Sequence, residues 1–328
     1  MVLLRFSLKG VRRKLAIVAC TGLFGVASFA GLSVLAANVY EEPAVNEASA
    51  SGIVYAAANS NRAGEVMQAL ALAHPKRLSS ALQRGGDWAV QLRGVWYYYA
   101  DGRLLPEHMR DRAGQYSAQP FYQYYEKLPE WKMPSQEDAQ RLAMAASNRQ
   151  SSTRQNRSQF FYDDLWNIRD YDEAWMQQKT TRFFGKDILV HHAILEELAL
   201  VEQRINKIAE TKSAVKNWKN NLDSITSWNW RSIADIKTRS NHAYGIAVDL
   251  QMKNPNKLET YWLWTAEKRA DWWNVPYSAR LSPPEEVIKA FEAYGFIWGG
   301  KWIFYDTMHF EYRPEILILN DIPIEGEY

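Results

Sequence analysis

Two short segments near the C-terminus combine histidines with carboxylates, the side chains that bind metal ions through nitrogen and oxygen. Residues 240–249 read SNHAYGIAVD, and residues 306–311 read DTMHFE. A catalytic zinc takes three protein ligands and leaves a fourth position for water. His242, Asp249 and His309 supply such a set, so these segments predict a hydrolytic metal centre.

The cysteine and histidine counts narrow the choice of metal ligands. Cys20 is the single cysteine, so neither an internal disulfide nor a thiolate site is available in the remainder of the chain. Ligands must therefore be histidines and carboxylates. The six histidines are His74, His108, His191, His192, His242 and His309.

Metal-assisted hydrolysis also needs a carboxylate that moves a proton and does not bind the metal. Asp306, three residues before His309, is the best candidate for this general base. Glu311 follows His309 by two residues, so on a strand it shares the face of the histidine. We therefore expect Glu311 to orient that ligand from outside the coordination shell.

The spacing of the ligands demands two bends in the chain. His242 and Asp249 are seven residues apart, and on one continuous strand they would point to opposite faces. Gly245 is where the chain can bend at little cost, before a buried strand that leads to Asp249. The odd spacing of Asp306 and His309 predicts a turn at residues 307–308, with a strand beginning near His309.

The remaining pattern predicts an α+β domain in which a small antiparallel sheet and flanking helices carry the site. Alternating apolar residues predict two strands at 88–92 and 95–99 with a turn at Arg93-Gly94, and Asp101-Gly102 marks a further hairpin. Apolar periodicity predicts helices at 188–209 and 282–295. Short strands are expected at 296–298, 301–305 and 309–312.

A second histidine pair offers a rival metal site. His192 and Glu196 are four residues apart on the predicted helix at 188–209 and could share a metal on one face. The second histidine of an HExxH motif is absent, which favours ordinary helix-end histidines here.

The N-terminus has the pattern of an export signal. Five basic residues precede an uncharged apolar run at 15–39, and Ala36 and Ala37 are small enough for a cleavage site. The same run is long enough to remain as a membrane anchor. We expect the chain to act in the periplasm or cell envelope, either cleaved or anchored to the inner membrane by residues 15–39.

Composition and pattern divide the chain into three predicted parts. Residues 1–40 are the signal or anchor, residues 41–185 an accessory region with a small β unit and a linker, and residues 186–328 the domain that carries the predicted zinc site, which the resemblance described below implies is a peptidase domain. A net charge of +2 and a pI near 8.4 give no reason to expect nucleic-acid binding. Nothing in the pattern predicts an oligomeric state.

The two motifs resemble those of a known family. Ser-x-His-x-x-Gly-x-Ala-x-Asp followed by Asp-x-x-His-Phe-Glu is similar to the VanY-like D-alanyl-D-alanine carboxypeptidases and L-alanyl-D-glutamate endopeptidases. The resemblance implies a fold like that of hedgehog and DD-peptidase domains, Zn²⁺ on His242, Asp249 and His309, and Asp306 as general base. The resemblance extends over residues 228–312 and leaves 41–185 unexplained.

The same resemblance implies a substrate and residues that bind it. Peptidoglycan stem peptides are the expected substrate, and the aspartate at Asp306, where carboxypeptidases often have glutamate, favours the endopeptidase branch. The family carries an arginine upstream of the first motif that binds a substrate carboxylate or carbonyl, and Arg231 and Arg239 are both candidates. Ser240 is the third expected substrate-binding residue.

Three other functions compete with this interpretation. A D-alanyl-D-alanine carboxypeptidase would need a site closed at one end by a positive group. A cell-wall binding protein would have a degenerate site, yet the ligand set here is complete. A hedgehog-like signalling domain is disfavoured by the export signal and by Asp306.

Overall fold

The computed structural model describes residues 62–150, 156–233, 238–254 and 256–325. The predicted export segment at 15–39 lies outside these residues. Among the described residues, no helix has both the length and the apolar character needed to cross a bilayer.

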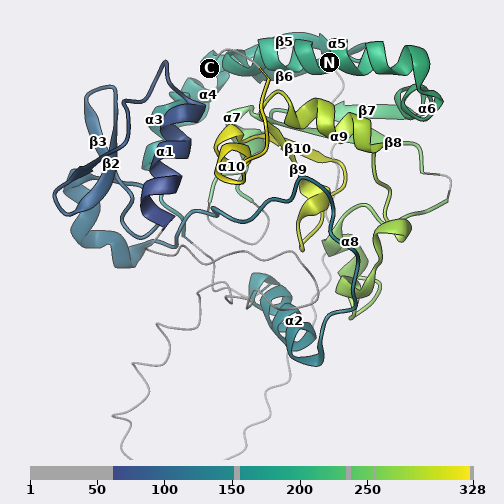
Figure 1. The fold of residues 1–328 in the computed structure, drawn as a ribbon, viewed down its shortest axis with the longest axis horizontal. Coiled ribbons are helices and arrows are strands. Elements are labelled where there is room, and N and C mark those ends of the chain that lie inside the picture. Colours follow the sequence, from purple (N-terminus) through teal and green to yellow (C-terminus); the bar gives the residue numbers. More distant parts are fainter. Residues whose placement is uncertain (1–61, 151–155, 234–237, 255, 326–328) are drawn as a thin grey trace, which may run out of the picture. The chain divides into compact units, whose positions relative to one another are not determined.

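Helices and small antiparallel sheets are mixed along the chain, as the sequence predicts (Figure 1). The described strands are β1 (Leu82–Arg84), β2 (Asp87–Leu92), β3 (Val95–Tyr98), β4 (Leu105–Pro106), β5 (Gln178–Phe183), β6 (Lys186–His191), β7 (Leu222–Thr226), β8 (Ala247–Met252), β9 (Phe296–Trp298) and β10 (His309–Tyr312). The described α-helices are α1 (Ala63–Ala73), α2 (Gln136–Gln150), α3 (Phe160–Trp166), α4 (Tyr171–Gln177), α5 (Leu195–Thr211), α6 (Ser213–Asn220), α7 (Asn241–Tyr244), α8 (Trp262–Ala266), α9 (Glu285–Glu292) and α10 (Pro314–Leu319). The 3₁₀ turns are η2 (Glu107–Gln115), η3 (His192–Ile194), η4 (Trp272–Asn274), η5 (Tyr277–Ala279) and η6 (Gly299–Lys301).

The predicted N-terminal hairpin is confirmed. Strands β2 and β3 pair in antiparallel register, and both turn residues, Arg93 and Gly94, have positive φ. Such a turn matches the right-handed twist of the two strands. The aromatic residues Tyr97, Tyr98 and Tyr99 are buried and belong to the core.

One hydrophobic cluster includes residues from both the accessory region and the peptidase region. It contains Leu70 of α1, Phe161 of α3, Val248 of β8 and Phe310 of β10. Strands β5 and β6, which flank the predicted boundary at residue 185, are the two halves of one hairpin. The accessory residues are thus packed into the same core that carries the predicted site.

The predicted helix at 188–209 begins too early. Residues Ile188 and Val190 lie in strand β6, and α5 starts only at Leu195. The alternation of buried and less buried residues along β6 is a strand period, and pairing with β5 takes precedence over the helical pattern. From Leu198 onward the predicted apolar face is buried.

Two expectations around α9 also need correction. The helix begins at Glu285 after Pro284, later than the predicted start at 282, and no side chain caps it. Residues 301–305 do not form a strand, because the chain enters the η6 turn at Gly299. Strands β9 and β10 lie where they were predicted.

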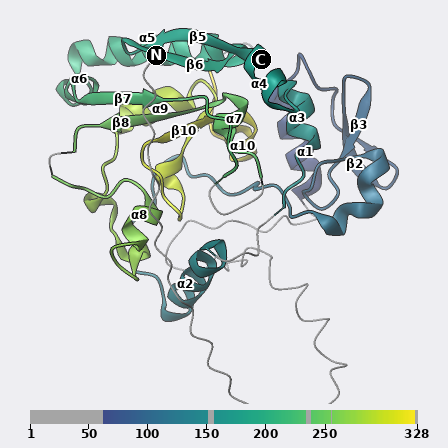
Figure 2. The same ribbon diagram turned by 180° about the vertical axis from the view of Figure 1, so that it is seen from behind.

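The C-terminal sheet has the order β7-β8-β10-β9. Strands β7 and β8 run side by side in both views (Figure 2), and β8 pairs with β10 so that Asp249 stands directly opposite His309. Helix α7 ends at Gly245, whose φ is +73°, and β8 follows at once. The predicted bend is therefore confirmed, and it places the end of α7 beside the β8–β10 pair.

Candidate metal centre and active-site cleft

Helix α7 and strands β8 and β10 bring His242, Asp249 and His309 together. Nε2 of His242 lies 3.1 Å from Oδ1 of Asp249 and 3.2 Å from Nδ1 of His309. The same Oδ1 lies 2.8 Å from Nδ1 of His309. These three residues form a cluster of side chains that could hold a metal ion.

In each histidine ring, the outer nitrogen, which points away from the cluster, is hydrogen-bonded. This bond fixes the direction of the inner nitrogen, which faces the cluster. Nδ1 of His242 donates to the carbonyl oxygen of Ser227 at 2.7 Å, and Nε2 of His309 donates to Oε2 of Glu311 at 3.0 Å. In the neutral rings, the lone pairs of the two inner nitrogens then face each other and Asp249. Such an arrangement is unfavourable unless a cation lies between them.

The donor set fits a zinc ion. With ligand bonds of about 2.0–2.1 Å, two ligand atoms of a tetrahedral site lie roughly 3.3 Å apart. The three observed separations, 2.8, 3.1 and 3.2 Å, approach that spacing. Two imidazoles and one carboxylate would leave the fourth position for a water molecule.

The pKa shifts of His309 and Asp249 indicate which charge the cluster favours. Burial lowers the pKa of His309, but hydrogen bonds with Asp249 and Glu311 raise it to about 10. Burial raises the pKa of Asp249, yet its bonds with the two histidines hold it well below its usual range. Both shifts show that the site favours positive charge between these groups.

Glu311 lies on the same face of β10 as His309, as the spacing predicts. It is buried, and Nδ2 of Asn241 donates to its Oε2 at 2.7 Å, while Nη1 of Arg313 lies 3.7 Å from its Oε1. Burial raises the pKa of Glu311, but His309 and Arg313 lower it below the usual value. Glu311 is thus an ionised acceptor that can orient His309.

Asp306 lies in the turn before β10, at the position the sequence predicts. Its Oδ1 accepts a hydrogen bond from the backbone nitrogen of Met308 at 3.2 Å, and the strand begins at His309. Burial and the charge of Asp249 raise the pKa of Asp306 to about 7, against the opposing effects of His309 and Arg231. The positive charge of a bound metal would lower this pKa again.

A pocket of about 210 Å³ opens onto the cluster and is lined by His242, His309, Glu311 and Asp306. One side of its lining comes from the accessory region, including Gln119, Tyr122, Ser158 and Tyr162. Residues 258–273 contribute Tyr261 and Trp262, and Trp262 also packs with Trp272 and Phe304 in a small second core. This segment therefore both packs and lines the cleft.

The two candidate arginines have different surroundings. The guanidinium of Arg239 donates to Asp163 and to the carbonyl oxygens of Ile168 and Arg169. Arg231 is exposed and lines the pocket, and its Nη1 donates to the carbonyl oxygen of Ser232 at 3.4 Å.

Ser240 has a structural contact of its own. Its side chain caps α7 by accepting a hydrogen bond from the backbone nitrogen of His242 at 3.3 Å. It is buried at the pocket wall. Its hydroxyl therefore helps to fix the helix that carries His242.

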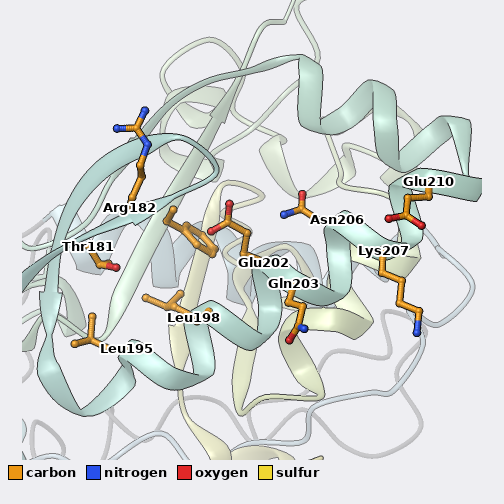
Figure 3. Close-up of a pocket in the computed structure, with 11 residues that line it drawn as sticks. Thr181, Arg182, Leu195, Leu198, Glu202, Gln203, Asn206, Lys207 and Glu210 are labelled. Atoms are coloured by element: carbon orange, nitrogen blue, oxygen red, sulfur yellow. The ribbon is translucent and has the colours of Figure 1, made fainter.

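The rival pair at His192 does not form a metal cluster among the described residues. His192 contacts Gln177, and His191 is bonded to backbone groups through both ring nitrogens. A larger pocket of about 630 Å³ lies along α5 and β5 and includes Phe183, Glu202 and Lys207 (Figure 3). It contains no histidine and none of the predicted site residues.

A match to a known protein family covers the residues of this site. Residues 234–312 match the family model for D-alanyl-D-alanine carboxypeptidases of peptidase family M15. This match supports the M15 zinc peptidase family. The matched residues include the three clustered side chains, Asp306 and Glu311, so a peptidase related to peptidoglycan is supported.

Other comparisons concern the remainder of the chain. Residues 66–121 match a domain of unknown function, DUF8518. Neither the curated proteins nor the solved structures contain a match to this chain.

Sequence reasoning missed the groups that hold the ligands in place. The carbonyl of Ser227 and the amide of Asn241 carry no recognisable motif signal of their own. Asn241 stands next to His242 in the first motif, and this adjacency was the one available hint. The contribution of Tyr122 and Tyr162 to the pocket had no signal in the sequence.

Proposed function

We propose that this chain is an exported, zinc-dependent peptidase that hydrolyses peptide bonds in peptidoglycan stem peptides, as an L-alanyl-D-glutamate endopeptidase of the VanY-like group. The observation that carries the proposal is the orientation of His242 and His309, whose free nitrogens converge on Asp249. The family match at residues 234–312 supports the same chemistry. A fold of the hedgehog and DD-peptidase kind is part of the proposal.

His242, Asp249 and His309 would hold the zinc, which supplies Lewis-acid activation for hydrolysis. Asp306 takes a proton from the attacking water as its oxygen bonds to the scissile carbonyl carbon. When the C–N bond breaks, Asp306 returns that proton to the leaving amine. Glu311 keeps the ring of His309 in the orientation that leaves Nδ1 free.

Arg231 is the better candidate for holding a carboxylate of the substrate. Its guanidinium is exposed at the pocket, whereas that of Arg239 is committed to three acceptors within the protein. An arginine pairs with a carboxylate through two parallel hydrogen bonds, which fixes the direction of the peptide in the cleft. Ser240 acts through its cap on α7.

Removal of a single D-alanine is the second candidate activity, because the matched family model is described as a D-alanyl-D-alanine carboxypeptidase. Arg231 could hold the terminal carboxylate of such a substrate just as well. The two activities leave different products from the same stem peptide, so a product analysis separates them.

Mass analysis of defined muropeptides, after incubation with the zinc-loaded full chain, tests the proposal. We expect cleavage between L-alanine and D-glutamate, and no product from the Asp306→Asn variant. Loss of one D-alanine would establish the carboxypeptidase instead. Intact muropeptides with the loaded wild-type protein would contradict both, and would favour a cell-wall binding protein.

Export is a separate part of the proposal and rests on the basic head and apolar run at residues 1–39. Fractionation of cells that express a tagged full chain tests it. We expect the protein in the periplasm or with the inner membrane, and a full-length product confined to the cytosol would contradict export.

A further inference from the structure

The segment that carries His242 is hydrogen-bonded to residues far from it in the sequence. Helix α3 of the accessory region lies beside α7 in both views (Figure 1 and Figure 2). Oδ1 of Asp163, on α3, accepts a hydrogen bond from the hydroxyl of Tyr244, on α7, at 2.6 Å, and the same oxygen accepts one from Arg239. One carboxylate thus binds both the last residue of α7 and the loop that leads into it.

Further contacts join residues 157–163 of the accessory region to residues 238–244. The backbone nitrogen of Arg157 donates to Oγ1 of Thr238 at 3.2 Å, and Oε1 of Gln159 accepts from the backbone nitrogen of Arg239 at 3.2 Å. The guanidinium of Arg239 also packs over the ring of Tyr244. These bonds fix residues 238–244, and His242 with them, to a part of the chain outside the peptidase match at 234–312.

Burial explains why Asp163 is the decisive member of this set. The side chains of Arg239 and Asp163 are only 13% and 16% exposed, and Tyr244 is 3% exposed. Removing this largely buried carboxylate takes away the charged acceptor of Arg239 and the acceptor of the Tyr244 hydroxyl, which costs more than the pair itself contributes. The backbone around His242 would then lose the hydrogen bonds that hold Arg239 and Tyr244 to α3.

Two other contacts link the accessory region to His309. The hydroxyl of Tyr122 accepts a hydrogen bond from Nε1 of Trp302 at 2.6 Å, and the ring of Trp302 lies 5.4 Å from that of His309. The hydroxyl of Tyr162 lies 3.3 Å from Nη2 of Arg313, which pairs with Glu311. The accessory region therefore reaches His309 by two routes, one through Trp302 and one through Arg313 and Glu311.

We propose that Asp163 is a positioning residue of the metal centre, and that the accessory region is an integral part of the peptidase and not a separate module. Asp163 touches neither substrate nor metal, and acts by fixing α7 through Tyr244 and Arg239. The inference rests on the proposed function for its metal ligands, but its structural content does not depend on a bound ion.

The neighbouring residue supplies a matched control. Asp164 is 19% exposed and also accepts hydrogen bonds from one tyrosine and one arginine, Tyr97 and Arg169. Its partners lie in the accessory region, and the side chain of Arg169 contacts Asp164 and Glu173, whereas only the backbone carbonyl of Arg169 accepts from Arg239. Asp163→Ala and Asp164→Ala thus remove equivalent groups from the same helix and differ in what those groups hold.

Two readouts on the full chain test the proposal: amide hydrogen exchange at residues 238–246 in the metal-free protein, and Zn²⁺ affinity by competition with a chelator. We expect Asp163→Ala to speed exchange there and to weaken Zn²⁺ binding about tenfold, the lower end of the range for groups that support metal ligands. Asp164→Ala should leave both unchanged. Wild-type exchange and affinity in Asp163→Ala, or equal changes in both variants, would overturn the proposal.

Tyr244→Phe serves if Asp163→Ala does not fold, because it removes only the hydroxyl that Asp163 accepts from. It should change exchange and affinity in the same direction by a smaller factor, and wild-type values would again overturn the proposal. A wild-type chain that takes up no Zn²⁺ would defeat the proposed function alone, since the exchange comparison still decides the role of Asp163.

Discussion

The molecule contains two pairs of adjacent histidine rings, and the pairs differ in where their nitrogens point. The ring centroids of His242 and His309 are 5.0 Å apart, and those of His191 and His192 are 4.7 Å apart. His191 binds the carbonyl of Trp166 through Nε2 and accepts from the backbone nitrogen of Ala193 through Nδ1. Both nitrogens of His191 are satisfied by the backbone, whereas His242 and His309 each keep one nitrogen for the cluster.

The similar ring distances of the two pairs show that the proximity of two histidines is not sufficient for a metal site. What matters is whether a second hydrogen bond fixes each ring so that a lone pair is left facing another ligand. Burial lowers the pKa of His191 to about 3, so this ring is a neutral structural group. In contrast, the contacts of His309 with two carboxylates favour positive charge.

The largest effect should come from replacing a histidine in each pair. His309→Ala should lose zinc and activity, with a fall in affinity beyond the 10–100-fold expected for supporting groups. His191→Ala should keep one zinc per chain and lose about 1–3 kcal/mol of stability, because the carbonyl of Trp166 loses its donor. Metal analysis and thermal unfolding measure both, and zinc retention in His309→Ala would erase the distinction between the pairs.

Substitutions at Asp306 and Glu311 should distinguish loss of proton transfer from loss of support for the metal ligand His309. Asp306→Asn keeps the shape and removes the base, so we expect hydrolysis to slow by about 10²–10⁴-fold with zinc still bound. Glu311→Gln should instead weaken zinc binding by about 10–100-fold. Zinc titration and the rate of stem-peptide cleavage distinguish the two, and loss of metal in Asp306→Asn would reverse the assignment.

The buried neutral histidines predict how stability depends on pH in the metal-free protein. Burial lowers the pKa of His74 from 6.5 to about 4, so the unfolded chain takes up a proton before the folded one does. This contribution to stability is complete above pH 6.5 and is lost as the pH falls toward 4. Its size is on the order of 3 kcal/mol, from about 1.4 kcal/mol per unit of pKa.

Urea unfolding between pH 7 and pH 4, with the metal removed, checks this dependence. The difference in unfolding free energy between the wild type and His74→Gln should shrink as the pH falls, because only the wild type has this titrating group. A difference that stays constant over that range would show that His74 is not held neutral by the fold.

The two arginines distinguish substrate binding from stability of the fold. Arg231→Ala should raise KM about tenfold or more, as expected for a lost hydrogen bond to a charged group, and leave stability within about 0.5 kcal/mol of the wild type. Arg239→Ala should destabilise the fold by about 3 kcal/mol, since it leaves Asp163 buried without its partner. Kinetics and unfolding of both variants check this, and the reverse pattern would exchange their roles.

Features set by local chemistry could be predicted from the sequence. The bend at Gly245 is one, because its φ of +73° lies in the left-handed region that glycine adopts without strain, and the turn at Arg93-Gly94 is another. The grouping of Asp249 with His309 was predicted from the ligand set, and the structure places them opposite each other on β8 and β10. In these cases, residue type and spacing were sufficient.

Features set by distant contacts could not be predicted. Residues 188–190 have a helical apolar period, but pairing with β5 makes them a strand. The bond between Asp163 and Tyr244 joins residues that are 81 positions apart, and neither residue belongs to a motif that indicates the other. The choice between Arg231 and Arg239 likewise depends on which guanidinium the fold has already engaged.

X-ray absorption at the zinc edge of the loaded full chain tests the central claim most directly. We predict one zinc per chain with nitrogen and oxygen ligands at about 2.0–2.1 Å, two of them imidazoles, and no sulfur. A sulfur ligand, a different number of imidazoles, or no zinc retained after dialysis would contradict the metal centre formed by His242, Asp249 and His309.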